Sequence, residues 1–370
     1  MAQRKKAVSR KKALVPKSDL ISGNIGKGRV NLKTLGEYLG LSPATISLVL
    51  NNAPGAKAIS AETSARVREA AKKFDYRPSF FARALQGKRT FSIGVLIPQL
   101  NDNYCASIME GVEEVLIEEG YIYLTACHRR SHDLIEEYPR LLMERAVDGF
   151  ILIDTPPLPS DRWLVPVVAV AGHTPVANVT NIQLDQRRAA ELGLQHLYQL
   201  GHRKIAFMRG AAYSSDADDR WNSFRTVAEE IGLTIDDRLV ITIPLNISSP
   251  ELGYPATQQL LAGKAPFTAI VAFNDLAAIG ALRAIREHGL HVPEDISILG
   301  FDDISAAAYQ NPALTTIRQP LHDIGRIAAH TLLRRITQKE VGGDISTQII
   351  PELIVRQSTG RVTSRKHEPR

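Results

Sequence analysis

The chain has 370 residues, of which 23% are charged, and its formal net charge is +6 at neutral pH. This length is sufficient for two or three domains with sizeable cores. No apolar run is long enough to cross a bilayer, and the basic N-terminus is not followed by the apolar stretch of a secretory signal. These features argue against a membrane or secreted protein, and we expect a soluble, cytoplasmic one.

The charge is distributed unevenly along the chain. Residues 1–89 contain 19 lysines and arginines against 5 aspartates and glutamates, a net charge of +14. Residues 90–370 contain 26 against 34, a net charge of −8. A basic front end on an acidic body indicates a polyanionic partner for the front end only. Residues 1–29 also lack apolar periodicity, so we expect a disordered tail that attracts phosphates non-specifically.

Residues 30–77 predict three short helices with tight turns. Asn31, Ser42 and Ser60 are suitable N-caps, and Gly40 is the expected left-handed residue that ends the first helix. In a helix-turn-helix, the beginning of the second helix enters the major groove of DNA. The residues predicted to contact DNA from this helix are Pro43, Ala44, Thr45, Ser47, Leu48 and Asn51.

From residue 91 to residue 357, short β-rich runs alternate with helical patterns. The candidate strands are Ser92–Ile97, Ile122–Ala126, Gly149–Asp154, Val167–Ala171, Ile205–Arg209, Val240–Ile243, Ala269–Phe273 and Ser297–Phe301. The candidate helices span 104–119, 132–145, 186–200, 218–231, 249–262, 276–288 and 321–338. Such alternation makes parallel sheets with helices on both faces. Two halves in series imply a cleft, where small ligands bind at the carboxyl ends of the strands.

The body contains no motif typical of catalysis or metal binding. It has neither a nucleophile elbow nor an H-E-x-x-H sequence, and Cys105 and Cys127 do not have metal-binding or redox spacing. His202 fits a turn between a helix and a strand better than a ligand position. We therefore expect no cofactor, no metal ion and no enzymatic activity.

Several motifs resemble those of the LacI/GalR family of bacterial repressors, in the family's order and spacing. The front end has L-G-L-S-P-A-T-I-S-L-V-L-N and Y-R-P-S-F-F-A-R-A-L-Q-G-K-R-T, and the body has I-G-V-L-I-P, Q-H-L-Y-Q-L-G-H-R-K-I-A-F, F-N-D-L-A-A-I-G-A-L-R-A-I, I-S-I-L-G-F-D-D-I and L-T-T-I-R-Q-P. The resemblance extends to about residue 357. It implies a helix-turn-helix headpiece and an α/β body with a bilobed, periplasmic-binding-protein-like fold of two doubly wound parallel sheets. The chain would cross between the lobes near 187–190, 314–318 and 340–346.

The resemblance also assigns residues 78–90 to a hinge helix and linker. In the family, two such helices from a dimer enter the minor groove and wedge a leucine into the central base step of the operator. Leu85 matches that leucine, and Ala82 matches the small residue where the helices meet. Ser79 and Arg83 are the expected phosphate contacts.

A small effector, either sugar-like or nucleobase-like, would bind between the lobes. The positions that match the family's effector contacts are Tyr104, Cys105, Arg220, Asn274 and Asp302. Other roles remain open for some of these residues and their neighbours. Arg220 can form a surface ion pair with an aspartate at 216, 218 or 219, and Asp275 and Asp303 can cap helices.

The interpretation that follows is a homodimeric transcriptional regulator, most often a repressor in this family, which binds palindromic operator DNA under the control of an effector. The tail at 358–370 has no leucine heptads, so a dimer is favoured over a tetramer. The alternatives are a bilobed small-molecule binding protein, or an enzyme, with a non-specific basic tail. A protein co-regulator in place of a small effector is a further alternative.

Overall fold

The computed structural model describes residues 30–51, 54–76, 89–171, 176–210, 215–243, 250–338 and 347–362. The chain divides into two compact units, Met1–Thr90 and Phe91–Arg370. The predicted basic tail, residues 77–88 of the hinge region and the last eight residues lie outside the described residues. The roles assigned to Ser79, Ala82, Arg83 and Leu85 therefore stay predictions.

The first unit is built on α2 (Leu32–Leu39), α3 (Pro43–Leu50) and α4 (Ala61–Lys73), with a 3₁₀ turn, η1 (Pro54–Ala58), between the last two. Each helix begins at a predicted cap, because the side chains of Asn31, Ser42 and Ser60 accept hydrogen bonds from backbone N–H groups three residues later. The three helices enclose a small core of Leu35, Ile46, Val49, Val67 and Ala70.

The turn between α2 and α3 depends on two glycines. Gly40 ends α2 with a φ of +67°, a conformation that glycine adopts without strain. A Cβ on Gly36 would lie 2.8 Å from the carbonyl oxygen of Leu41, so a larger residue would push the turn away from α2. These two positions hold α3 close to α2 and at a defined angle.

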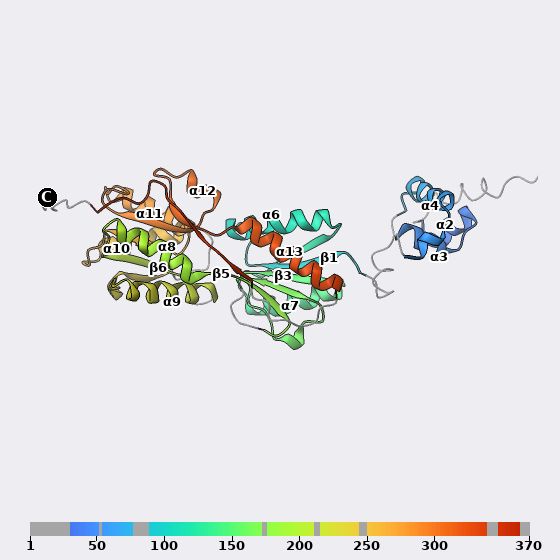
Figure 1. The fold of residues 1–370 in the computed structure, drawn as a ribbon, viewed down its shortest axis with the longest axis horizontal. Coiled ribbons are helices and arrows are strands. Elements are labelled where there is room, and N and C mark those ends of the chain that lie inside the picture. The colour runs from blue at the N-terminus through green and yellow to red at the C-terminus, as the bar shows by residue number, and fades with distance from the viewer. Residues whose placement is uncertain are drawn as a thin grey trace, which may run out of the picture. The chain divides into compact units, whose positions relative to one another are not determined.

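The second unit contains two six-stranded sheets (Figure 1). The first has the order β11-β5-β4-β3-β1-β2, and every neighbouring pair is parallel. Its strands are β1 (Ser92–Ile97), β2 (Ile122–Cys127), β3 (Gly149–Ile153), β4 (Val167–Val170), β5 (Val179–Leu184) and β11 (Thr347–Ile349). The helices α6 (Asn103–Glu118) and α13 (Leu321–Gln338) pack on one face, and α7 (His132–Glu144) packs on the other. We call this sheet with its helices the first subdomain.

The second sheet has the order β12-β10-β9-β8-β6-β7. Its strands are β6 (Ile205–Arg209), β7 (Val240–Thr242), β8 (Ala269–Val271), β9 (Ser297–Asp302), β10 (Thr315–Arg318) and β12 (Glu352–Ile354). One face carries α8 (Gln186–Gln199) and α9 (Ser215–Glu230), and the other carries α10 (Gly253–Ala262) and α11 (Asp275–Glu287). The short α12 (Ser305–Ala308) follows β9. This second subdomain departs from the expected parallel sheet at one edge, where β12 is antiparallel to β10.

The chain passes between the subdomains three times (Figure 1). It leaves the first sheet after β5 to form α8, returns after β10 to form α13, and leaves again between β11 and β12. The last passage follows the expected region 340–346, because β11 still pairs with β5 of the first sheet. Three passages place the carboxyl ends of strands from both sheets at the junction of the subdomains.

Candidate DNA interface and effector site

The first turn of α3 presents the residues predicted to contact DNA. Pro43 and Ala44 are exposed, and Thr45 is half-buried. The Thr45 hydroxyl lies 2.9 Å from Ser42 Oγ, the oxygen that caps the helix. The cap therefore also orients the Thr45 side chain at the end of α3 that would approach the bases.

The last turn of α3 is ordered by a second set of contacts. The Asn51 amide donates to the carbonyl and hydroxyl oxygens of Ser47, at 2.9 and 3.1 Å. Leu48 is half-buried, and a Cβ on Gly55 would lie 3.3 Å from its Cδ2, so η1 covers part of this side chain. The DNA contacts assigned to Ser47, Leu48 and Asn51 stay predictions.

A group of charged and polar residues, which we call the junction cluster, lies where the two subdomains of the second unit meet. Its members follow strands β1, β2, β3 and β6, or end strand β9. They are Asp102, Tyr104, Arg130 and Asp154 of the first subdomain, and Asp216, Arg220 and Asp302 of the second. Burial raises the pKa of the Tyr104 phenol, and Asp216, Asp154 and Asp302 raise it further. Carboxylates from both subdomains therefore lie close enough to this phenol to raise its pKa.

Arg220 makes contacts on every side of its guanidinium group. Its Nη1 donates to the backbone oxygen of Phe273 at 2.7 Å, and its Nε lies 3.4 Å from Gln186 Oε1. Its Nη2 forms an ion pair with Asp216, and the guanidinium carbon lies 3.6 Å from the centre of the Phe301 ring. The expected ion pair with a neighbouring aspartate is thus present, but it is buried, with side-chain exposures of 6% for Arg220 and 12% for Asp216.

The first subdomain contributes a second ion pair, between Arg130 and Asp154. Arg130 Nη2 lies 2.5 Å from Asp154 Oδ2, and each side chain is 16% exposed. Burial raises the pKa of Asp154, while Arg130 opposes that shift. Beside this pair, burial and then Arg130 lower the pKa of His128 to about 4, so that imidazole is neutral near pH 7.

Asp302 ends β9 in a left-handed conformation, with a φ of +110°. Its Oδ1 accepts a 2.7 Å hydrogen bond from Gln319 Nε2, and the residue is 5% exposed. Burial raises its pKa well above the ordinary value, although Arg220 opposes the shift. The other oxygen, Oδ2, receives no hydrogen bond from any side chain or backbone group that the structure describes.

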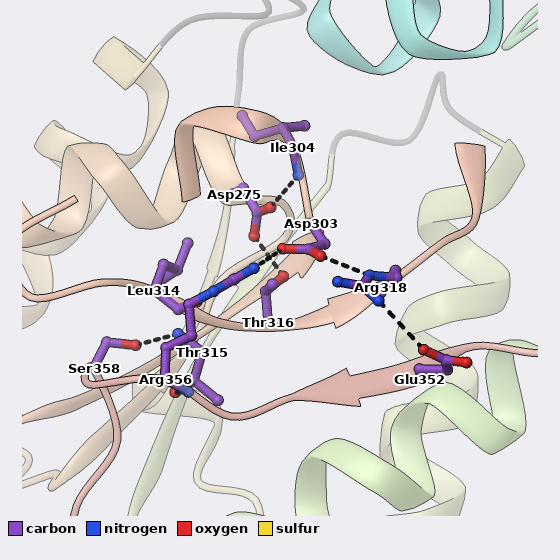
Figure 2. A network of polar contacts seen from close by, with 10 residues as sticks. All are labelled: Asp275, Asp303, Ile304, Leu314, Thr315, Thr316, Arg318, Glu352, Arg356 and Ser358. Atoms are coloured by element: carbon purple, nitrogen blue, oxygen red, sulfur yellow. Dashed lines mark hydrogen bonds and ion pairs between the residues drawn. The ribbon is translucent and has the colours of Figure 1, made fainter. Parts of the chain in front are cut away.

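Asp303, the next residue, does not cap a helix as the sequence suggested. Its carboxylate accepts from Arg318 Nε at 2.7 Å and from Arg356 Nη2 at 2.6 Å (Figure 2). Arg318 belongs to β10 and Arg356 follows β12, so one buried carboxylate ties the end of β9 to both strands that carry the chain across the junction. These contacts hold Asp302 in place.

The helix-capping role expected for Asp275 belongs to Asn274 instead. Asn274 caps α11, because its Oδ1 accepts from the backbone N–H of Ala277 at 2.9 Å. Asp275 is fully buried and accepts from the Ile304 N–H at 2.9 Å and the Thr316 hydroxyl at 2.6 Å (Figure 2). The capping role expected for Asp275 is therefore wrong, since its side chain links α11 to the loop after β9 and to β10.

Cys105 is 1% exposed and lies in the apolar core of the first subdomain. Its neighbour Tyr104 is half-buried at the start of α6. The effector contacts assigned to these two residues, and to Arg220, Asn274 and Asp302, stay predictions. Among residues of the cluster, sequence reasoning missed Asp102, Arg130 and Asp154. Asp102 and Arg130 follow predicted strands and Asp154 ends one, and this position at the carboxyl ends of strands is the signal that could have found them.

Comparison with known proteins assigns the chain to a family. Residues 35–79 match the model of bacterial regulatory proteins of the lacI family, and residues 194–359 match that of a periplasmic binding protein-like domain. The chain is 33% identical over 335 residues to the HTH-type transcriptional repressor PurR of Haemophilus influenzae, covering 88% of this chain and 98% of the relative. The chain belongs to the LacI family.

Solved structures agree with this assignment. The lac repressor dimer bound to operator and the anti-inducer ONPF superposes with a TM-score of 0.79 at 27% identity, covering 90% of this chain and all of that one. A transcriptional regulator CelR–cellobiose complex gives 0.66 at 26% identity, covering 89% and 100%. This LacI-family protein is a DNA-binding transcriptional regulator under effector control, and it is not an enzyme. No described helix is both long and apolar enough to cross a membrane.

Proposed function

We propose that this LacI-family regulator binds a palindromic operator as a homodimer in the cytoplasm and represses transcription. The observation that carries the proposal is the headpiece. Its helix α3 is capped by Ser42 and packs closely against α2 through a glycine-containing turn, and it belongs to a segment, residues 1–89, of net charge +14. The lac repressor, which shares its fold, is a dimer on an operator.

The proposed effector site is the junction cluster. A ligand there would touch both subdomains, so it would favour one of their relative arrangements and thereby alter operator affinity. Asp302 would accept hydrogen bonds from the ligand, and Tyr104 would offer a ring for stacking. The cellobiose complex of CelR supports a sugar-like effector, and a nucleobase-like one presents the same kinds of donor groups.

The test is selection of bound sequences from a random DNA pool at fixed salt. The wild type, Leu85→Ala and, as a control, Leu164→Ala, a change at a side chain 84% exposed on the body, would be compared. We expect the wild type and the control to enrich a palindrome with a defined central base step. In Leu85→Ala the preference at that step should relax and affinity should fall by about 1–3 kcal/mol, the range expected when recognition of one base-pair position fails.

Each result decides one part of the proposal. An unchanged central step in Leu85→Ala would contradict the wedge role. Binding without any enriched sequence in the wild type would contradict operator recognition and leave only phosphate attraction. An enriched operator would then serve to screen sugars and nucleobases for compounds that change its affinity.

A further inference from the structure

The strongest unexplained feature of the junction cluster is the buried pair of Arg220 and Asp216. A guanidinium group at a ligand site ordinarily binds carboxylate or phosphate in a bidentate manner. Here Asp216 occupies one edge of the Arg220 group, the Phe273 carbonyl occupies Nη1 and the Phe301 ring covers one face. Arg220 therefore has little capacity left for an anionic ligand.

A second side chain locks Asp216 in that position. The Gln186 amide donates to Asp216 Oδ1 while its carbonyl oxygen lies 3.4 Å from Arg220 Nε. Gln186 is itself buried at the start of α8, just after the chain crosses from the first subdomain. Gln186, Asp216 and Arg220 thus each contact the other two side chains, which fixes the ion pair in place.

The charge balance of the cluster also disfavours anionic ligands. Within the described residues its carboxylates are those of Asp102, Asp154, Asp216 and Asp302, and its cations are Arg130 and Arg220. Both arginines are already paired with aspartates. The segments that follow β4, β6 and β7 in the sequence, at 172–175, 211–214 and 244–249, contain no lysine, arginine, aspartate or glutamate. Carboxylates therefore outnumber cationic side chains in the junction cluster.

The acceptor that remains is Asp302. This residue is 5% exposed, and no group in the described part of the chain donates to its Oδ2. In its ionised form, which Arg220 favours against the effect of burial, Asp302 would repel a negatively charged ligand. A hydroxyl, amide or amine group of a ligand would donate a hydrogen bond to this oxygen.

We propose that Asp216 is a built-in counter-ion that withholds Arg220 from ligands, so that the junction cluster rejects anionic effectors and accepts uncharged or cationic hydrogen-bond donors. Sugar phosphates and nucleotides are thereby excluded, whereas unmodified sugars, amino sugars and amino-substituted bases are admitted. The inference rests on the proposed effector site, and it assigns that site its charge class.

The experiment titrates the full-length protein with inorganic phosphate and with sulfate, using sodium chloride of matched ionic strength as the reference. The probe is the fluorescence of Trp221, which adjoins Arg220 in sequence, in a Trp163→Phe background, because the chain has two tryptophans. We expect no saturable response in this background alone. Adding Asp216→Asn should free Arg220 and produce a saturable response, with at least about tenfold tighter anion binding, or about 1.4 kcal/mol.

Three further variants make the outcome specific. Glu110→Gln removes an exposed carboxylate from α6, and it should behave like the background. Adding Arg220→Gln to Asp216→Asn should abolish the gain. Asp216→Ser removes the same charge with a smaller side chain and replaces Asp216→Asn if that variant does not fold.

The proposal is overturned if the background protein binds phosphate as tightly as Asp216→Asn, if the folded Asp216 variants gain nothing, or if the gain survives Arg220→Gln. The basic headpiece is identical in all variants, so its own anion binding cancels in the comparison. Selection of operator DNA does not depend on this result. A failed selection with a positive anion titration would reject the proposed function and keep the counter-ion role.

Discussion

At the scale of single residues, His128 illustrates how local contacts set a protonation state. Its Nδ1 accepts from the backbone N–H of Arg130 at 3.0 Å, so its Nε2 carries the proton and donates to Thr155 Oγ1 at 2.9 Å. A second proton would have to sit on Nδ1, where it would face a donor. The residue is 1% exposed, so water cannot compensate.

This geometry predicts a pH-dependent contribution to stability. The pKa of His128 in the folded state is about 4 and the ordinary value is 6.5, so on acidification the unfolded chain takes up the proton first. The stability that neutral His128 permits is therefore present above pH 6.5 and lost as the pH falls towards 4. The free energy of unfolding of the wild type, relative to that of His128→Gln, should decline by about 2 kcal/mol between pH 7 and pH 4.

Denaturant unfolding at several pH values measures this difference. Burial raises the pKa of Asp275 to about 7, so that group acts in the opposite direction over the same range. It is present in both proteins and cancels when they are compared. Parallel pH profiles for the two proteins would contradict the assigned neutral state.

At the scale of elements, the packing of α6 against α13 depends on a pair of glycines. A Cβ on Gly111 would collide with the backbone oxygen of His322, and one on Gly325 would collide with that of Ile108. The helices therefore approach more closely than side chains would allow. Because α13 is the helix formed on the second passage of the chain, this contact anchors the returning segment to the first subdomain.

Gly325→Ala should accordingly destabilise the body. The added methyl group must force the two helices apart, which costs about 1–3 kcal/mol when a packed interface is overfilled. Glu110→Ala, an exposed change on α6 beside Gly111, is the matched control and should alter stability by less than about 0.5 kcal/mol. Thermal unfolding of the two variants distinguishes them, and equal midpoints would contradict the close-packing account.

Most of the helices and eight of the strands were predictable from apolar periodicity, whereas β5, β10, β11 and β12 were not. β5 has the sequence V-T-N-I-Q-L and β10 has T-T-I-R, and polar residues interrupt their apolar pattern. β11 and β12 have three residues each. These four strands flank the passages between subdomains, and each pairs with a strand distant in the sequence, β11 with β5 and β12 with β10.

At the scale of the whole molecule, the separation of charge predicts that DNA binding and effector binding respond differently to salt. Residues 1–29 contain nine lysines and arginines. A shortened chain, 30–370, should show a smaller salt dependence of operator affinity, by roughly one unit of log–log slope for each phosphate that residues 1–29 neutralise. The sequence that it selects should stay the same, because the predicted base contacts belong to α3 and the hinge.

Binding isotherms at several salt concentrations, with the full chain as reference, measure the two slopes. Identical slopes would show that residues 1–29 do not contact phosphates. A changed target sequence would contradict the assignment of base recognition to residues after 29.

The sequence by itself determined the headpiece, its caps, the alternating body and the family. Caps such as Asn31 and Ser42 act on N–H groups three residues away, so their signals are local and readable. Only the tertiary structure decided that Asn274 rather than Asp275 caps α11, and that Asp303 binds Arg318 and Arg356.

The tertiary structure also decided that Arg220 forms a buried ion pair with Asp216. The neighbouring Asp216 was a visible candidate partner, but its burial and its fixation by Gln186 depend on α8 and α9 packing together from separate segments. Burial converts an ordinary surface pair into a closed one, because water no longer competes for either charge. The charge class of the proposed effector site follows from that packing, which no local pattern in the sequence encodes.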